Sequence, residues 1–124
     1  MVPSEVKLHS RSGVLELIYG DGKTFELSAE YLRVFSPSAE VQGHRPDQRK
    51  LQDGKRDVLI RALDPQGHYA LRIEFSDGHD SGIFSWDYLY RLGTEYPKLW
   101  QEYLAELEAA GKSRAPSLIA TSAI

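Results

Sequence analysis

Two of the three Asp-Gly pairs in this chain, at positions 21–22 and 77–78, constrain its fold more than any other feature. Each pair follows a segment rich in strand-forming residues, 14–19 for the first and 69–75 for the second, and another such segment comes after it. Asp and Gly tolerate the positive φ angles of tight turns, so Asp-Gly between two strand-like segments is a strong hairpin signal. The chain is therefore predicted to build antiparallel strand pairs.

The length of each turn decides which residues of a hairpin face each other. If Asp-Gly fills a two-residue turn, Ile18 lies opposite Phe25 in the first hairpin, and Ser76 lies opposite His79 in the second. Side chains alternate between the two faces of a strand. This register places His79 on the outward face, together with Arg72.

The second hairpin also carries the clearest core pattern. Residues 58–63 form a further predicted strand, and residues 64–67, which include a proline, form a predicted turn. The segment that follows alternates between apolar and polar residues, as a half-buried strand does. Its expected core-facing residues are Tyr69, Leu71, Ile73 and Phe75.

Two serines are placed to begin short helices. Ser28 is expected to cap a helix over residues 29–35, and Ser85 a helix over residues 86–92, because a serine hydroxyl can accept a free N–H of the first turn. Gly93 is expected to end the second of these helices.

A longer helix is predicted near the end of the chain, capped by Thr94 and ended by Gly111. The spacing of its apolar residues is that of one helical face, namely Tyr96, Leu99, Trp100, Tyr103, Leu104 and Leu107. The predicted fold class is α+β, with an antiparallel sheet of hairpins packed by short helices and by this longer C-terminal helix. We expect one domain over residues 1–111, a flexible tail over residues 112–124, and a long polar loop over residues 36–56.

Composition excludes several classes of function. The chain has no cysteine, which excludes disulfides, thiolate metal sites and cysteine nucleophiles. The first residues do not resemble a signal peptide, and no apolar run approaches the roughly 20 residues of a membrane helix. We therefore expect a cytoplasmic, bacterial protein with no membrane partner. The net charge of −3 disfavours nucleic acid as a binding partner. The sequence nevertheless holds a local basic cluster of Arg45, Arg49, Lys50, Lys55 and Arg56.

Asp77, His79 and Asp80 are the strongest candidates for chemistry. An imidazole beside carboxylates can bind a metal or act as a general base, with a carboxylate orienting its second nitrogen. The same residues have a structural explanation, because the turn alone requires Asp77 and Gly78. We favour the structural explanation, since hairpins are far more common than catalytic histidines. His44 could join His79 and a carboxylate around a metal only if the long loop folds over the hairpin.

Catalytic motifs are absent from the sequence. It contains no Gly-x-Gly-x-x-Gly, no phosphate-loop lysine motif and no Gly-x-Ser-x-Gly elbow. An acid–base pair of His79 and Asp77 would lack a nucleophile and a cofactor site. We therefore predict no catalytic residue, and we disfavour an enzyme.

Three blocks of the sequence carry a resemblance to a known family. They are Glu30-Tyr31-Leu32-Arg33-Val34-Phe35-Ser36-Pro37-Ser38-Ala39-Glu40-Val41, Gly67-His68-Tyr69-Ala70-Leu71, and Phe75-Ser76-Asp77-Gly78-His79-Asp80-Ser81-Gly82-Ile83-Phe84-Ser85-Trp86-Asp87-Tyr88-Leu89. Together they resemble the gamma-butyrobetaine hydroxylase-like N-terminal domain, in its stand-alone bacterial form of unknown function. The resemblance covers roughly residues 3–108 and implies a compact α+β domain.

The resemblance also raises the question of a metal. In the carnitine-synthesis oxygenases a similar domain precedes an iron- and 2-oxoglutarate-dependent catalytic domain, and it binds structural zinc through three cysteines and a histidine. By this resemblance His79 matches the histidine, while Ser36, Ser38 and Val41 stand at the cysteine positions. A serine hydroxyl is a poor zinc ligand and valine is none. We therefore predict no zinc of that type and no other cofactor.

The favoured function is that of an accessory or protein-interaction domain with an unknown protein partner. Similar domains are appended to P-loop ATPases linked to iron–sulfur cluster assembly, so the resemblance implies a connection with metal-related processes. The alternative is a protein that binds iron or zinc through His79 and a second histidine, such as His44, or a carboxylate. The expected interaction surface comprises Arg33, Ser36, Ser38, His44, Asp77, His79, Asp80 and Trp86.

Overall fold

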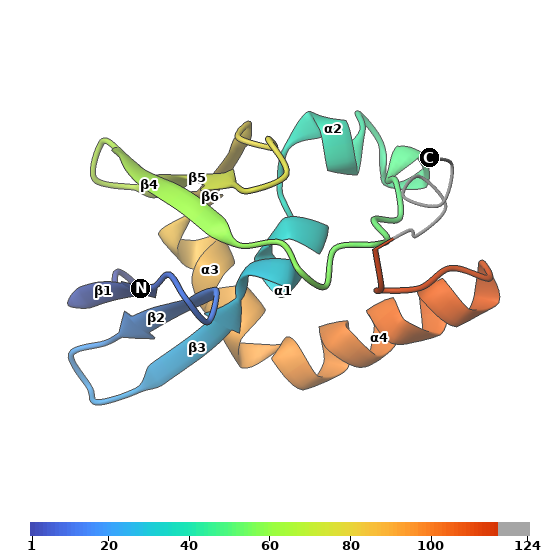
Figure 1. Cartoon of the computed structure of the whole chain (residues 1–124). Helices are drawn as coiled ribbons and strands as arrows, with labels where there is room; N and C mark the ends of the chain where they lie inside the picture. Colours follow the sequence, from blue (N-terminus) through green and yellow to red (C-terminus); the bar gives the residue numbers. More distant parts are fainter. Residues whose placement is uncertain (117–124) are drawn as a thin grey trace.

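Two three-stranded antiparallel sheets and four α-helices form the fold (Figure 1). The computed structural model describes residues 1–116, apart from the side chain of Pro46. The first sheet has the order β1-β2-β3 and the second the order β4-β5-β6. This arrangement confirms the predicted α+β class. The strands are β1 (Glu5–His9), β2 (Val14–Ile18), β3 (Thr24–Ser28), β4 (Ile60–Gln66), β5 (Ala70–Phe75) and β6 (Gly82–Ser85).

The helices connect and cover the sheets. They are α1 (Ala29–Val34), α2 (Ala39–Gln42), α3 (Trp86–Thr94) and α4 (Tyr96–Ala109). The two predicted serine caps are confirmed, because Ser28 Oγ accepts the Tyr31 N–H at 3.0 Å and Ser85 Oγ accepts the Tyr88 N–H at 3.1 Å. Helix α2 and a short 3₁₀ turn, Pro46–Gln48, interrupt the stretch expected to be a long loop.

The predicted boundary between α3 and α4 was wrong. Gly93 lies inside α3 rather than ending it, and α4 begins after Glu95, which makes no capping bond. The Thr94 hydroxyl donates to the Arg91 carbonyl oxygen at 3.1 Å instead of capping α4. A Cβ at Gly93 would lie 2.3 Å from the ring of Phe25. The glycine is therefore explained by close packing of α3 on β3.

The predicted register of the first hairpin was wrong by one residue. Leu17, not Ile18, lies opposite Phe25. The Tyr19 N–H donates to the Lys23 carbonyl oxygen at 2.9 Å and closes a three-residue loop. The last residue of that loop, Gly22, has φ +90°. A type I turn followed by such a glycine is the usual geometry of three-residue hairpin loops.

The second hairpin has the same kind of three-residue loop, and here the loop changes the position of the His79 side chain. The Phe75 N–H donates to the His79 carbonyl oxygen at 2.9 Å, and Gly78 has φ +92°. Phe75, not Ser76, therefore faces His79. Along the strands the predicted register is kept, with Arg72 opposite Ile83 and Ile73 opposite Gly82. The pairing shifts by one residue only between these strands and the turn, and such a shift moves a side chain to the other face of a sheet. His79 was expected to point outward, but it is buried, with 6% of its surface exposed.

The β4–β5 connection also departs from expectation. Pro65 was predicted in a turn but lies within β4. An edge strand tolerates proline, because the missing N–H need not pair with a neighbour. The turn comes later, at residues 67–69, and leaves Tyr69 66% exposed rather than in the core. Leu71, Ile73 and Phe75 are buried as predicted.

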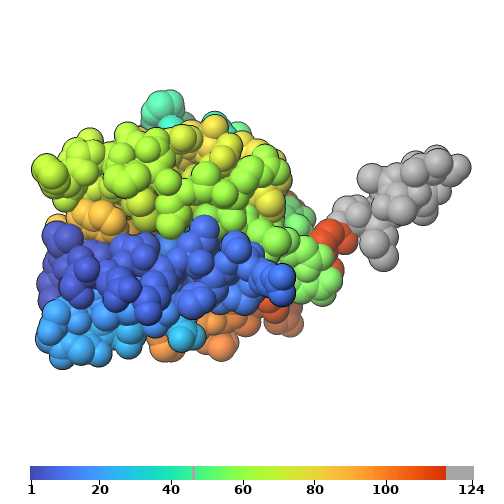
Figure 2. Space-filling view, turned by 60° about the vertical axis from the view of Figure 1, so that its left-hand side comes forward, coloured from blue at the N-terminus to red at the C-terminus, as the bar shows by residue number. Residues whose placement is uncertain are grey.

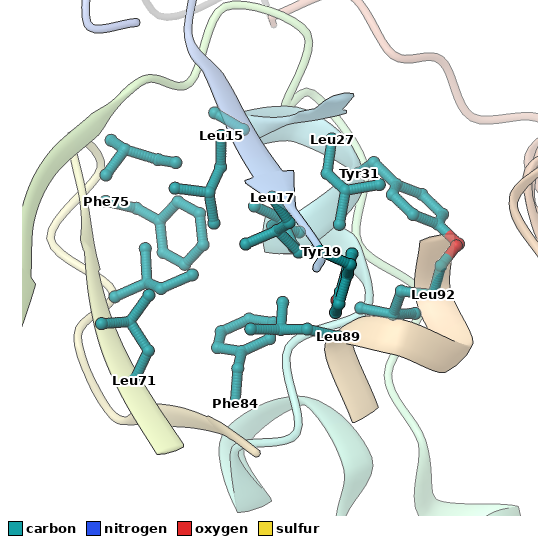
Figure 3. Packing of buried hydrophobic residues seen from close by; sticks show 14 residues of the cluster. Leu15, Leu17, Tyr19, Leu27, Tyr31, Leu71, Phe75, Phe84, Leu89 and Leu92 are labelled. Carbon is teal, nitrogen blue, oxygen red and sulfur yellow. The ribbon is translucent and has the colours of Figure 1, made fainter. Parts of the chain in front are cut away.

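The main core lies between the two sheets (Figure 3). Leu15 and Leu17 of β2 point into the same space as Leu71, Phe75 and Phe84 of the second sheet. Side chains of α1 and α3 enclose this space on the remaining sides, namely Tyr31, Leu89 and Leu92. A smaller cluster joins α1 to α4 through Val34, Tyr103 and Leu107.

Residues 112–116, which belong to the segment expected to be a flexible tail, contact the fold. The carbonyl oxygens of Ser113 and Arg114 accept the N–H groups of Gly54 and Arg56 at 2.9 and 3.0 Å. The Arg114 guanidinium donates two hydrogen bonds, of 2.7 and 2.8 Å, to the buried carboxylate of Glu30. The rest of the expected tail, residues 117–124, lies outside the described residues.

Figure 2 shows the N-terminal sheet and the strand β4 side by side across one face of the molecule. Within residues 1–116, no helix combines the length and the apolar character needed to cross a lipid bilayer.

Candidate functional site

The best candidate site joins the segment between α1 and α2 to the β5–β6 hairpin. Ser36 follows α1, and His79 is the residue that closes the hairpin loop. The Ser36 Oγ and His79 Nε2 atoms are 2.8 Å apart, although the two residues are separated by 43 positions. Both are buried, and Ser36 has no exposed surface. The one-residue shift between the turn and the strands of this hairpin makes this contact, because it turns the imidazole inward.

The neighbours of His79 determine where its proton lies. The Glu40 carboxylate is 3.3 Å from His79 Nδ1. An ionised carboxylate only accepts hydrogen bonds, so Nδ1 carries the proton of the neutral ring and donates to Glu40. The other nitrogen, Nε2, is then an acceptor, and the Ser36 hydroxyl donates to it.

Two further serines extend the same hydrogen-bond chain. Ser81 Oγ donates to Glu40 Oε1 at 3.1 Å, and Ser38 Oγ lies 2.7 Å from Ser81 Oγ. Because the Ser81 proton goes to Glu40, the Ser38 hydroxyl donates to Ser81. Ser38 Oγ in turn accepts the Glu40 N–H at 3.2 Å, and Ser36 Oγ accepts the Ser38 N–H at 3.3 Å. Every polar group of this chain therefore has a partner within the protein.

We call this set of five residues the serine–histidine clasp: Ser36, Ser38, Glu40, His79 and Ser81. Its tight packing depends on Gly82, the first residue of β6. A Cβ at that position would lie 2.4 Å from Ser36 Oγ, far inside normal contact. The α1–α2 segment thus lies directly against the backbone of the second sheet.

Burial and charge both act on the His79 ring. Burial lowers the pKa of His79, and the nearby Arg33 guanidinium lowers it further. The carboxylates of Glu40 and Asp77 act in the opposite direction, and the net result is a pKa below the usual 6.5. The ring is therefore neutral at pH 7, as the hydrogen-bond assignment requires.

Asp77 forms a separate ion-pair group beside the clasp. Its Oδ2 accepts hydrogen bonds from Arg33 Nε and Lys55 Nζ, each at 2.9 Å, and its Oδ1 accepts the His79 N–H at 3.2 Å. Burial of the carboxyl tends to raise its pKa, but the bonds from Lys55, the His79 N–H and Arg33 together hold the pKa of Asp77 at about 2. Asp77 is thus an ionised turn residue that anchors two cations.

The acid–base pair of His79 and Asp77 weighed from the sequence does not form. Asp77 accepts the backbone N–H of His79, while the ring of His79 contacts Glu40 and Ser36. The sequence already disfavoured this pair, and the structure separates the two side chains because the imidazole turns inward.

The order Ser36, His79, Glu40 has the connectivity of an acyl-transfer triad, in which a base activates a hydroxyl and a carboxylate orients the base. The hydroxyl of such a triad must reach a substrate. Ser36 is fully buried, and Gly82 packs against its Oγ. No substrate carbonyl can approach this hydroxyl in the structure, and the arrangement joins the α1–α2 segment to the second hairpin.

The residues at the expected metal positions do not fit zinc. Ser36 and His79 bond to each other, and the Ser38 hydroxyl is engaged with Ser81. Val41 has no donor atom. Among residues 1–116, no group of three or more His, Cys, Asp or Glu side chains is arranged to hold a metal ion. The clasp therefore occupies the place that the resemblance assigns to zinc ligands.

The other candidate residues lie apart from the clasp or on its rim. His44 is exposed, and its backbone N–H donates to Gln48 at 2.9 Å rather than bringing the ring to His79. Asp80 is exposed and lies 3.7 Å from Arg72. Trp86 follows the far end of β6, where its Nε1 donates to the His68 carbonyl oxygen at 3.0 Å. Trp86 and His79 thus belong to opposite ends of the second sheet.

Sequence reasoning missed Glu40 and Ser81 as parts of the site. The signal for Glu40 was an acidic residue in the first turn of a helix that Ser38 caps. Ser81 carried no signal of its own, because its role depends on how the hairpin meets α2.

Comparison with known proteins identifies the family. A family model described as gamma-butyrobetaine hydroxylase-like, N-terminal, matches residues 6–90. The chain belongs to this family. The matched residues include the whole serine–histidine clasp and both sheets, apart from Glu5 at the start of β1. A search of curated proteins finds no match.

Solved structures support this family assignment. Two proteins with NMR solution structures are 54% and 45% identical to the chain, with TM-scores of 0.81 and 0.78. The alignments cover 94% and 93% of this chain, and 91% and 86% of those proteins. A crystal structure from Acidithiobacillus ferrooxidans ATCC 23270 is of a protein of unknown function in the DUF971 family. It is 40% identical, with a TM-score of 0.62 over 73% of this chain and 91% of that one.

Proposed function

We propose that this member of the gamma-butyrobetaine hydroxylase-like N-terminal family is a non-catalytic accessory domain that acts through a protein partner. One observation carries the proposal. The residues best suited to chemistry, Ser36 and His79, are buried and bonded to each other. Because their polar atoms are occupied by this hydrogen bond, the two side chains support the shape of the surface above them rather than a reaction.

The burial of several expected contact residues supports a smaller contact surface for the proposed partner. Of the expected contact residues, Arg33, Ser36, Ser38 and His79 are buried. They hold the α1–α2 segment against the hairpin. His44 and Asp80 are exposed near them, as is Glu40, whose side chain is 70% exposed. We therefore place the contact on this exposed rim, with the clasp as its support.

Quantitative affinity capture from extract of the native cell tests the proposal. The tagged wild-type chain is expected to retain at least one protein at near-stoichiometric amounts. A His44→Ala/Asp80→Lys double variant is expected to lose it, while Ser12→Ala, on the far loop between β1 and β2, is expected to keep it. Recovery of no protein above the background of an unrelated tagged domain would contradict the proposal. The identity of a captured protein also tests the connection with iron–sulfur cluster assembly, which rests on the resemblance alone.

A second candidate function is metal binding, and one contact favours it. The exposed Glu40 carboxylate reaches His79 Nδ1, so a histidine and a carboxylate are already side by side. Zinc and iron sites need more protein ligands than these two, and His44 would have to move to supply a third. Metal analysis of protein purified without chelators tests this function. Stoichiometric iron or zinc that disappears in His79→Ala would favour it over the accessory role.

A further inference from the structure

Basic residues gather in one segment of an acidic chain. Residues 43–56 contain five Lys or Arg and two Asp, whereas the whole chain contains 15 Lys or Arg and 18 Asp or Glu. Within this segment His44, Arg45 and Lys50 are exposed. The segment follows α2 directly, so its cations extend from the rim of the serine–histidine clasp toward α4.

Two hollows adjoin this basic segment. The smaller one, of about 350 Å³, is lined by Gln42, Gly43, His44, Arg45 and Arg49. The larger one, of about 430 Å³, lies between the segment and the helices α3 and α4. The two hollows share Gln42 and Arg49. They are therefore neighbours on the surface, with Arg49 between them, and we call the two hollows together the furrow.

The two parts of the furrow differ in chemistry. The larger hollow combines apolar side chains, including Phe35 and Leu99, with charged ones, including Arg91 and Glu102. Its volume lies within the usual range of ligand pockets. The smaller hollow is lined by polar and cationic groups. An occupant that fits both parts combines an apolar side chain with carboxylates.

The charged side chains that line the furrow determine which way such an occupant can lie. Arg45 lies 3.5 Å from Asp47, but both side chains are exposed, and an exposed pair of this kind contributes little and exchanges easily. Arg49 is bonded to Glu106 on the α4 side. Glu102 also lines the larger hollow there. Carboxylates of the occupant must therefore lie toward His44 and Arg45, and its apolar group toward α4.

We infer that this furrow binds an acidic segment of a partner protein, with one apolar side chain in the α3–α4 hollow and flanking carboxylates on Arg45 and Lys50. The inference rests on the proposed accessory function. It specifies the partner's binding segment as acidic with one apolar side chain. Nucleic acid fits less well. The acids Asp47, Glu102 and Glu106 along the furrow would repel a continuous polyanion, whose binding depends on phosphate neutralisation.

NMR titration with designed probes tests this inference. The main probe is a capped pentapeptide with leucine between two pairs of glutamates. It is expected to shift the amide signals of residues 42–50 and of α3 and α4 around Leu92 and Leu99. Replacing the leucine by glycine is expected to weaken binding about tenfold, because partial burial of a leucine is worth on the order of 1.4 kcal/mol. Higher salt is expected to weaken binding by both peptides.

Matched charge variants locate the binding surface. Arg45→Glu/Lys50→Glu is expected to weaken binding of the leucine peptide at least tenfold. Arg11→Glu/Lys98→Glu makes the same change in net charge at exposed positions outside the furrow, and it is expected to leave the affinity unchanged. Equal loss in both variants would overturn the inference. So would equal binding of a lysine version of the peptide, or tighter binding of a ten-nucleotide single-stranded RNA.

The outcome separates this inference from the proposed function. If Arg45→Glu/Lys50→Glu captures the same cellular protein as the wild type, the furrow is not the docking surface, although the accessory function stands. If the wild type captures no protein at all, the accessory function itself fails.

Discussion

Ser36 and His79 share a 2.8 Å hydrogen bond across 43 residues of sequence, and neither has more than a trace of exposed surface. The bond joins the segment between the first two helices to the second hairpin. Buried polar pairs of this kind fix one arrangement of two segments, because each group would lack a partner in any other. The exposed rim and the basic furrow are built on this fixed arrangement.

Ser36→Ala is expected to lower the free energy of unfolding by about 1–3 kcal/mol, because it leaves His79 Nε2 buried without a donor. Chemical denaturation measures this change. Ser12→Ala provides the matched control, since the Ser12 hydroxyl donates to an exposed carbonyl oxygen at 3.3 Å. The control is expected to change stability by less than about 0.5 kcal/mol. Equal effects of the two variants would contradict a structural role for the bond.

Gly82→Ala is expected to destabilise the fold because its Cβ would meet Ser36 Oγ at 2.4 Å. Forcing the two segments apart is expected to cost about 1–3 kcal/mol, as overpacking usually does. Gly20→Ala is the control, since a Cβ there meets no atom within 4 Å. Thermal unfolding of both variants tests this expectation. A Gly82→Ala variant as stable as Gly20→Ala would show that the clasp is loosely packed.

The sequence could predict the two hairpins but not the face on which His79 lies. Asp-Gly marks both turns correctly, yet it is compatible with a two-residue turn and with a three-residue loop that ends in glycine. In the first hairpin those two geometries differ by one residue in the register of the strands. In the second hairpin the strands keep the predicted register, and the shift at the turn decides whether His79 faces solvent or Phe75. Only the packing of Phe75 in the core and the approach of Ser36 select between them.

Stability is expected to fall in two steps as the pH is lowered. Burial lowers the pKa of His79 in the folded protein below its unfolded value of 6.5. The unfolded chain therefore takes up a proton near pH 6.5 before the folded protein does, and the free energy of unfolding decreases below that pH. Urea denaturation across pH 5–8 measures the effect. His79→Ala is expected to abolish this step, and His68→Ala, an exposed position, to preserve it.

Asp77 accounts for the second step. Its pKa is about 2 in the folded protein against 3.8 in the unfolded chain, so the stabilisation is present above pH 3.8 and is lost as the pH falls toward 2. The loss is expected to be on the order of 1–2 kcal/mol. Asp77→Asn should remove this step while leaving the step near pH 6.5 in place. If Asp77→Asn lost the same stability between pH 3.8 and pH 2 as the wild type, Arg33 and Lys55 would not hold the carboxylate as the structure indicates.

Arg114→Ala is expected to destabilise the fold by on the order of 3 kcal/mol, because it leaves the Glu30 carboxylate buried without its cation. Arg91→Ala removes an exposed pair with Glu95 instead, and it is expected to cost less than 1 kcal/mol. Adding Glu30→Gln to Arg114→Ala should recover part of the loss. Chemical denaturation of the three variants measures these changes in the free energy of unfolding. Equal losses for Arg114→Ala and Arg91→Ala would contradict a stabilising role for the Glu30–Arg114 pair.

Long-range pairs such as Glu30 with Arg114 and Glu40 with His79 could not be predicted from one sequence. Local patterns fix strands, caps and helical faces, because these depend on neighbours within a few residues. The serine caps and the apolar face of α4 were predicted for that reason. Glu40 and Arg114 lie in polar stretches without periodicity, and their partners are 39 and 84 positions away. Only the assembled fold brings these pairs together.

His79 is a neutral, hydrogen-bonded residue of the fold, and we propose that this arrangement leaves it unable to bind a metal. Nitrogen-15 NMR of the imidazole rings at pH 7, before and after one equivalent of zinc or iron(II), tests it most directly. We expect His79 to show a protonated Nδ1 and an unprotonated Nε2, and to keep both signals unchanged when metal is added. A protonated Nε2, or a shift of the His79 nitrogens that saturates at one equivalent of metal, would contradict the claim.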